Sequence, residues 1–81
     1  MKTIISHGWS HQVFMQVIDD LYKHGLLTKH QHRSLYGQAR AFHKGGHFQI
    51  MRYLDKRYSW SYSYIDGSYD NLGMIVRIHL A

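Results

Sequence analysis

The spacing of apolar residues changes once along this chain, at Ser59, and this change constrains the fold more than any other feature of the sequence. Before Ser59 the apolar residues recur at every third or fourth position, as in an α-helix that buries one face. After Ser59 they alternate with polar or small residues, as in a β-strand. The sequence therefore predicts an α+β fold, in which three short helices pack against a C-terminal antiparallel β-hairpin or small sheet.

The first two predicted helices have recognisable ends. The first begins at Ser10, a good N-cap residue, and stops at Gly25. The second opens with Thr28 and Gln31, the pattern of a capping box, and continues to about Lys44. The predicted core residues share helical spacing and are Val13, Phe14, Val17, Ile18, Leu21 and Tyr22 in the first helix and Leu35, Ala39 and Phe42 in the second.

Gly45 and Gly46 interrupt the helical pattern, and a third helix is predicted from about residue 47 to residue 58. Its apolar side carries Ile50, Met51, Leu54 and Tyr58. This assignment places all three helices before the change of period at Ser59.

The predicted strands follow directly. Trp60, Tyr62 and Tyr64 alternate with serines, which indicates a strand with one aromatic face and one small polar face. Residues 74–80 form a second alternating run, and residues 66–73 between them are rich in turn-forming types, so the two runs are expected to form a hairpin. Residues 2–5 are expected to add a short third strand.

The length and composition exclude several classes of protein. The 81 residues are expected to form one domain, residues 1–81, because a second core would not fit. The chain has no Cys, which excludes disulfides and thiolate zinc sites. It has no run of about 18 apolar residues, so we expect no membrane partner, and the cytoplasm is the default location.

The charge is strongly positive. Ten Lys and Arg face five acidic residues, every one an Asp, which gives a net charge of +5 and an isoelectric point near 9.7. This balance favours polyanionic or acidic partners, although a surplus of charge also serves solubility alone.

The second predicted helix concentrates part of this charge. At about 100° per residue, Lys29, Arg33, Arg40 and Lys44 fall within roughly 60° of one another on the side opposite the core residues. Gly37 lies on the same side, where a missing side chain either admits a phosphate or permits a close helix crossing. The pattern predicts a contact surface, and an ordinary solvated helix face is the alternative.

A second basic cluster is predicted on the third helix, where Gln49, Arg52, Lys56 and Arg57 point outward. Aromatic residues lie near both clusters, and this mixture suits phosphate contact with base stacking as well as protein interfaces. The candidate binding residues are Lys29, Arg33, Tyr36, Gly37, Arg40, Lys44, Gln49, Arg52, Lys56 and Arg57.

Neither a metal site nor a catalytic centre is expected. The pairs His7 with His11 and His43 with His47 have metal-ligand spacing, but the chain contains no Glu to complete a metalloprotease motif. Asp19 with Asp20 on one helix would point about 100° apart and form no acid/base pair. We therefore expect no cofactor and no enzymatic activity, with a small His-dependent nuclease as the weakest hypothesis.

Two resemblances refine the expected function. The order of three helices and a hairpin resembles a winged-helix module, which implies DNA binding by Gln49, Arg52 and Lys56, phosphate contacts from Lys29 and Arg33, and a wing at residues 66–70. The run from Gly25 to Gln38 resembles a pattern in short phage-type helical proteins, which implies a binding protein that blocks a host nucleic-acid machine, as anti-CRISPR proteins do.

The leading hypothesis is therefore a non-enzymatic, phage-type inhibitor with a basic face. Its expected partner is a host protein or nucleoprotein complex with an acidic or nucleic-acid-binding surface, and direct DNA or RNA binding remains open. A winged-helix regulator is the alternative. The sequence also leaves open a homodimer formed through the aromatic strand face.

Overall fold

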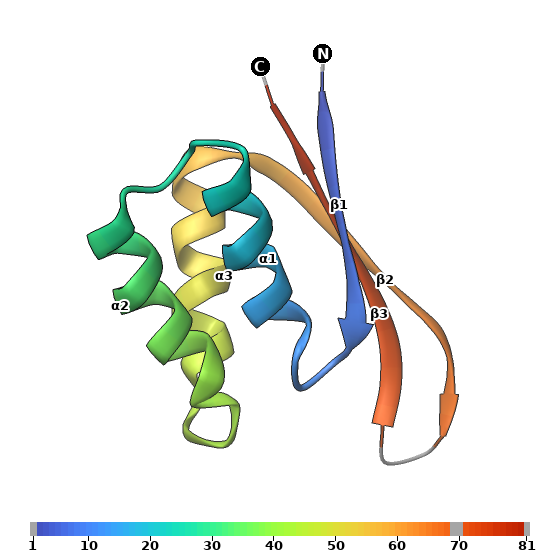
Figure 1. The fold of residues 1–81 in the computed structure, drawn as a ribbon. Coiled ribbons are helices and arrows are strands. Elements are labelled where there is room, and N and C mark those ends of the chain that lie inside the picture. Colours follow the sequence, from blue (N-terminus) through green and yellow to red (C-terminus); the bar gives the residue numbers. More distant parts are fainter. Residues whose placement is uncertain (1, 69–70, 81) are drawn as a thin grey trace.

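The computed structural model describes residues 2–68 and 71–80, which form two layers: an antiparallel sheet and helices that cover one of its faces (Figure 1). The elements in chain order are β1 (Thr3–Trp9), α1 (Val13–Lys23), α2 (Lys29–Arg40), the 3₁₀ helix η1 (Phe42–Lys44), α3 (Gly46–Arg57), β2 (Ser59–Ser68) and β3 (Asn71–His79). The α+β fold with three α-helices is thus confirmed, and the helices alternate in direction along the layer (Figure 1).

The sheet is not confined to the C-terminal part of the chain, because the N-terminal strand expected at residues 2–5 is part of it. Its strand order is β1-β3-β2, so the last strand is central and pairs with both others. β1 is also longer than the predicted residues 2–5, since the pairing runs from Thr3 opposite His79 to Trp9 opposite Gly73. The alternation was hidden in the sequence because Ser6, a polar residue, occupies a buried position of β1.

The hairpin is longer than predicted as well. The turn was expected over residues 66–73, yet pairing continues to Ser68 opposite Asn71, with an irregularity between Ile65 and Gly67. The hairpin tip at residues 69–70 lies outside the described residues, and so does the acidic side chain at position 70 that was assigned to the wing.

α1 begins later than its predicted N-cap. Ser10 instead donates its backbone N–H to the carbonyl oxygen of Leu72 (2.7 Å), which extends the strand contacts, and Gln12 occupies the N-cap position. The predicted stripe is otherwise buried over Val13, Phe14, Val17, Ile18 and Leu21. Tyr22 is the exception: its side chain is exposed and stacks on His32 at 4.6 Å between ring centroids.

The capping box at the start of α2 is confirmed. Gln31 donates its backbone N–H to Thr28 Oγ1 (3.1 Å), and the Gln31 side chain accepts from the Thr28 N–H (2.9 Å). The predicted end of this helix at Lys44 is wrong, because α2 stops at Arg40 and η1 follows. Phe42 therefore leaves the helix and is only half-buried, where the sequence pattern predicted a core residue.

A glycine brings α2 and α3 close together, but it is Gly46 and not Gly37. A Cβ on Gly46 would overlap the Gln38 carbonyl oxygen and would lie 3.0 Å from the Ala41 carbonyl oxygen, whereas a Cβ on Gly37 would meet nothing within 4 Å. The close helix crossing considered for Gly37 is therefore wrong. The neighbouring Gly45 has φ 81°, a left-handed conformation that favours glycine.

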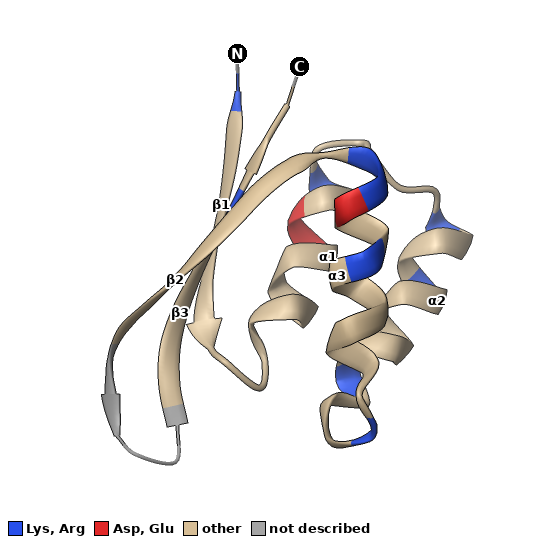
Figure 2. Cartoon of the chain, turned by 180° about the vertical axis from the view of Figure 1, so that it is seen from behind, with Lys and Arg blue, Asp and Glu red and all other residues tan. Residues whose placement is uncertain are grey.

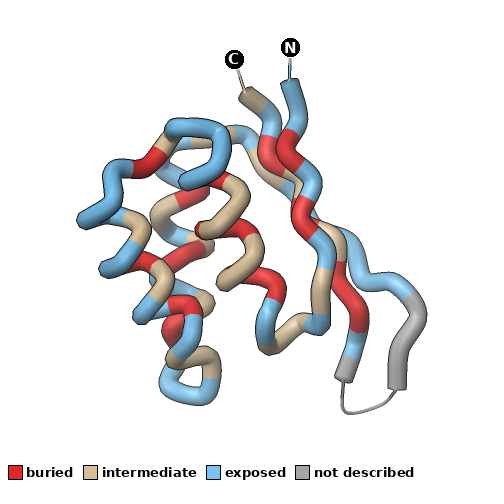
Figure 3. Tube along the Cα trace, viewed as in Figure 1, coloured by how far each residue is buried: buried red, intermediate tan, exposed pale blue. Residues whose placement is uncertain are grey.

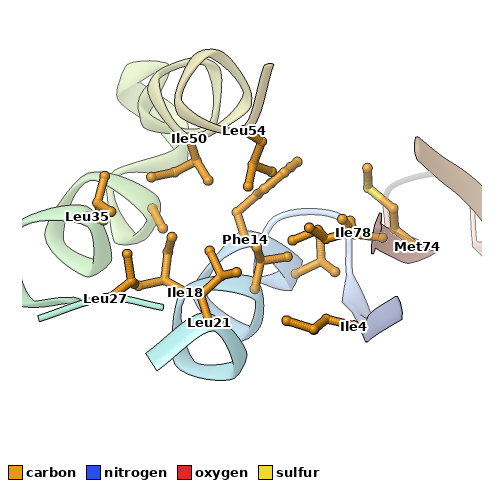
Figure 4. Packing of buried hydrophobic residues seen from close by; sticks show 14 residues of the cluster. Ile4, Phe14, Ile18, Leu21, Leu27, Leu35, Ile50, Leu54, Met74 and Ile78 are labelled. Atoms are coloured by element: carbon orange, nitrogen blue, oxygen red, sulfur yellow. The ribbon is translucent and has the colours of Figure 1, made fainter. Parts of the chain in front are cut away.

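The core lies between the helical layer and the sheet (Figures 3 and 4). Its buried hydrophobic residues are Ile4, Val13, Phe14, Val17, Ile18, Leu21, Leu27, Leu35, Ala39, Ile50, Leu54, Met74, Val76 and Ile78. Met51 and Tyr58, predicted in the stripe of the third helix, are half-buried against this core. The opposite face of the sheet carries no helix (Figure 1).

Candidate interaction surfaces

The positive charge of the molecule is not neutralised by its own carboxylates where the structure describes them. Asp19 pairs with His32 (2.8 Å), and Asp20 accepts hydrogen bonds from Ser6 Oγ (2.7 Å) and Gln16 Nε2 (2.9 Å). Asp55 accepts from Trp60 Nε1 (2.6 Å). Among the residues whose side chains the structure describes, 2–65 and 72–80, no Lys or Arg forms a salt bridge with an Asp, so these cations have no counter-charge among the described carboxylates.

The cations of α2 form one strip, which we call the α2 strip. It consists of Lys29, Arg33 and Arg40, all exposed, with the exposed Gly37 between the two arginines. Helical spacing places these residues on one side of α2, as predicted. Lys44 is not part of this helix, because it lies in η1, but it remains exposed.

Aromatic rings continue the α2 strip toward α1. The ring of His32 lies between those of Tyr22 (4.6 Å) and Tyr36 (5.6 Å), and the Arg40 guanidinium sits 5.8 Å from the Tyr36 ring centroid. Because His32 is also paired with Asp19 on α1, the side of α2 that carries His32 faces α1.

The candidate residues of α3 form a separate group. Gln49, Arg52, Lys56 and Arg57 are all exposed, and Arg57 lies 4.2 Å from the Tyr53 ring centroid. Figure 2 shows that Lys and Arg positions occur along both α2 and α3. Helical spacing puts Gln38, the neighbour of Gly46, on the side of α2 away from the α2 strip. The basic residues of α2 and α3 form two groups, one on each helix, and the single broad surface that the sequence predicts stays a prediction.

Tyr58 follows the α3 group at the start of the sheet. Burial raises the pKa of its phenol above the ordinary value, nearby Tyr53 raises it further, and Arg57 lowers it. The ring therefore stays neutral over the physiological pH range and belongs to the packing of α3 on β2 rather than to an acid/base centre.

A shallow basic depression lies where α2 ends. It has a volume of about 320 Å³ and is lined by Gly37, Arg40, Ala41, His43 and Lys44. The lack of a side chain on Gly37 keeps it open, since nothing else approaches that position. Two of the candidate binding residues, Arg40 of α2 and Lys44 of η1, line this depression.

An aromatic cleft of about 280 Å³ lies between α3 and the hairpin. We define it by its lining residues, which are Ser10, Phe14, Phe42, His47, Phe48, Met51, Tyr62, Tyr64 and Met74. On the helical wall the His47 ring stacks on Phe42 (4.2 Å, 26°) and contacts Phe48 (4.0 Å), while His47 Nδ1 is buried without a hydrogen-bond partner.

The aromatic face predicted for β2 contributes the strand wall of the cleft. Trp60 pairs opposite Ile78 and Tyr62 opposite Val76, so these rings lie on the helix-covered face of the sheet. Trp60 packs against the core, whereas Tyr62 (45%) and Tyr64 (57%) are exposed. The end of the β2–β3 hairpin extends past the helices (Figure 1).

Phe48 is the cleft residue that sequence reasoning missed. Its side chain is 58% exposed although phenylalanine is usually buried, and it stands on the outward half of α3. The available signal was its position: it falls outside the stripe formed by Ile50 and Leu54, which are fully buried.

The histidines do not assemble a metal centre in the described part of the chain. Among residues 2–65 and 72–80, whose side chains the structure describes, no group of three or more His, Asp or Glu side chains lies close enough to hold a metal ion. His43 and His47 also lie on different helical segments, η1 and α3, so their spacing of four residues is not that of one helix. Likewise, no described helix has the length and apolar character needed to cross a membrane.

No family model, curated protein or solved structure matches this chain.

Proposed function

We propose that this chain is a non-enzymatic binding protein that uses the exposed cations of α2 and α3 to engage nucleic acid or a host complex that handles nucleic acid. In its concrete form it is a phage-type inhibitor of a host defence complex, similar in mode of action to anti-CRISPR proteins. Such a protein acts by occupying a surface, which requires affinity but no catalytic group.

This proposal rests on the observation that no described Asp carboxylate neutralises the Lys and Arg side chains of α2 and α3. The three described carboxylates bond to His, Ser, Gln and Trp side chains, and the Lys and Arg side chains of α2 and α3 are left exposed. A bound polyanion releases condensed counterions when such cations contact its phosphates, and this release is the main source of affinity.

The test is a charge reversal on the α2 strip. The double variant Arg33→Glu/Arg40→Glu is expected to lose most of the affinity for a labelled oligonucleotide at about 50 mM salt, since each phosphate contact adds about −0.9 to the log–log salt slope. The matched control is Lys2→Glu, which changes an exposed lysine next to β1, on the sheet rather than on the helices. Fluorescence anisotropy over a salt series gives both affinity and slope.

Two results would count against this assignment. If the wild-type chain binds neither the oligonucleotide nor a labelled poly-glutamate peptide at low salt, the polyanion-binding function is wrong. Lys2→Glu changes the net charge half as much as the double variant does. If it causes half or more of the double variant's loss of binding free energy, the contribution is net charge and the α2 strip is not the contact surface.

A second candidate is the winged-helix regulator, favoured by one observation. The β2–β3 hairpin follows α3 directly, and Gln49, Arg52 and Lys56 are exposed on that helix, as a recognition helix requires. This candidate predicts tighter binding to duplex than to single-stranded DNA, and a loss of that preference in Arg52→Ala. Equal or weaker binding to duplex DNA would exclude it.

A further inference from the structure

Neighbouring residues of the same short helix, η1, line the aromatic cleft and the basic depression. Phe42 in η1 lines the cleft, and Lys44, two residues later in η1, lines the depression. The two hollows therefore share one wall, and a flexible chain can occupy both at once. One hollow is aromatic and the other cationic.

The cleft has the chemistry of a stacking site. Its two walls carry exposed rings, Phe48 on α3 and Tyr64 on β2, with 58% and 57% of their surfaces exposed. Exposed aromatic rings of this kind stack on nucleobases regardless of base identity, because every base has a π-face. The volume of about 280 Å³ also suits a single planar group rather than a helix or a strand.

The rim of the cleft is positively charged. Arg52 lies one helical turn after Phe48, so the two side chains are neighbours on the surface of α3, and both are exposed. The nearest described carboxylate on this helix, Asp55, is already bonded to Trp60 Nε1. A ligand that enters here meets a cation and no free described carboxylate of α3.

We propose that the aromatic cleft binds an unpaired base of single-stranded nucleic acid, while the adjacent phosphates lie in the basic depression at Arg40 and Lys44. This inference rests on the proposed polyanion binding and names the ligand for it. Charge complementarity favours a nucleotide chain as the ligand, because each of its units carries both a flat base and a negatively charged phosphate. An apolar peptide side chain could fill the cleft but would bring no negative charge to the depression.

The experiment compares single strands of equal charge, with and without bases, and adds a duplex. A labelled single strand of about ten nucleotides, as DNA and as RNA, is titrated with the protein alongside an abasic strand of the same length and a duplex. Tighter binding to the base-containing single strand is expected. The DNA and RNA arms distinguish the two sources of the same chemistry.

Substitutions locate the stacking. Tyr64→Ala and Phe48→Ala are each expected to weaken binding of the base-containing strand by about ten-fold and to leave binding of the abasic strand unchanged, with the same salt slope. Trp9→Ala is the control, because Trp9 is an exposed aromatic on β1 that lines neither the cleft nor the α2 strip. Far-UV circular dichroism confirms that each variant is folded.

The outcomes separate the two proposals. Equal binding of abasic and base-containing strands, or equal effects of Tyr64→Ala and Trp9→Ala, overturns the base site while polyanion binding stands. Failure of the wild-type chain to bind any oligonucleotide overturns the base site, and failure to bind the poly-glutamate peptide as well overturns polyanion binding. A poly-glutamate peptide that competes as well as the single strand and is equally weakened by Tyr64→Ala also overturns the base site, in favour of a protein ligand.

Discussion

The two glycines at the α2–α3 boundary provide a sharp test of how these helices pack, because the same substitution should have opposite effects at Gly37 and Gly46. Neither residue has a positive φ, so conformational strain does not separate them. What differs is the space around a new Cβ: open solvent at Gly37, and the carbonyl groups of Gln38 and Ala41 at Gly46.

The expected magnitudes follow from this geometry. Gly37→Ala should raise the free energy of unfolding by about 1 kcal/mol, the difference in helix propensity between Ala and Gly. In Gly46→Ala the new methyl group would lie 2.8 Å from the Gln38 carbonyl carbon, and rigid backbone must move apart to admit it. Overpacking of this kind costs about 1–3 kcal/mol, and we expect the upper end because no flexible side chain can give way.

The cost at Gly46 is amplified by what the contact holds in place. Gly46 donates its backbone N–H to the Ala41 carbonyl oxygen (3.0 Å), so separating α2 from α3 strains the bond that closes the turn through η1. A domain of this size has a total stability of about 4–12 kcal/mol. A loss of about 3 kcal/mol would therefore lower the melting temperature by roughly 12–24 °C.

Urea unfolding followed by far-UV circular dichroism measures both variants. We expect the transition midpoint to rise in Gly37→Ala and to fall in Gly46→Ala, with an unchanged slope of free energy against urea, since the same surface is exposed on unfolding. A Gly46→Ala variant as stable as the wild type would refute the close contact between α2 and α3, and a destabilised Gly37→Ala variant would refute the open position of Gly37.

Two further predictions concern the capping box and Tyr58. Thr28→Ala should lower the stability by about 1 kcal/mol in urea unfolding because the Gln31 N–H loses its acceptor, whereas Thr28→Ser keeps that acceptor and should stay near the wild type; equal losses would contradict the cap. The pKa of Tyr58 is raised in the folded state, so the unfolded chain releases the phenol proton at a lower pH than the folded chain does. The neutral Tyr58 phenol therefore contributes its full stabilisation below pH about 10, and this stabilisation is lost as the pH rises above that value. Tyr58→Phe should therefore lose stability less steeply than the wild type in urea unfolding at alkaline pH, and parallel losses would show that Tyr58 does not contribute.

The helices could be predicted from the sequence because their signals are local. The stripe from Val13 to Leu21 and the capping box at Thr28 each depend on residues within a few positions of one another. The strands carried a weaker signal, since β1 joins the sheet by pairing with a strand about seventy residues away in the sequence. Its buried Ser6, which donates to Asp20 on α1, breaks the apolar alternation that would have shown its full length.

The part of the candidate site that could be predicted from the sequence is the part that depends on local helical spacing. The exposure of Arg33 and Arg40 follows from helical spacing alone, and the structure shows it. The aromatic cleft requires knowledge of which face of β2 meets the helices and how far the hairpin extends past them, and both depend on the pairing with β3. Phe48 could not be assigned to a cleft before the position of that hairpin was known.

The break between α2 and η1 links the two parts of the proposed site. If α2 continued to Lys44, as its sequence pattern predicted, Phe42 would point into the core and Lys44 would extend the α2 strip. Because α2 ends at Arg40, Phe42 instead stacks on His47 in the cleft and Lys44 lines the depression. The turn that produces this arrangement is closed by Gly45 and Gly46, so a substitution at Gly46 should weaken nucleic-acid binding as well as stability, even at temperatures where the variant is folded.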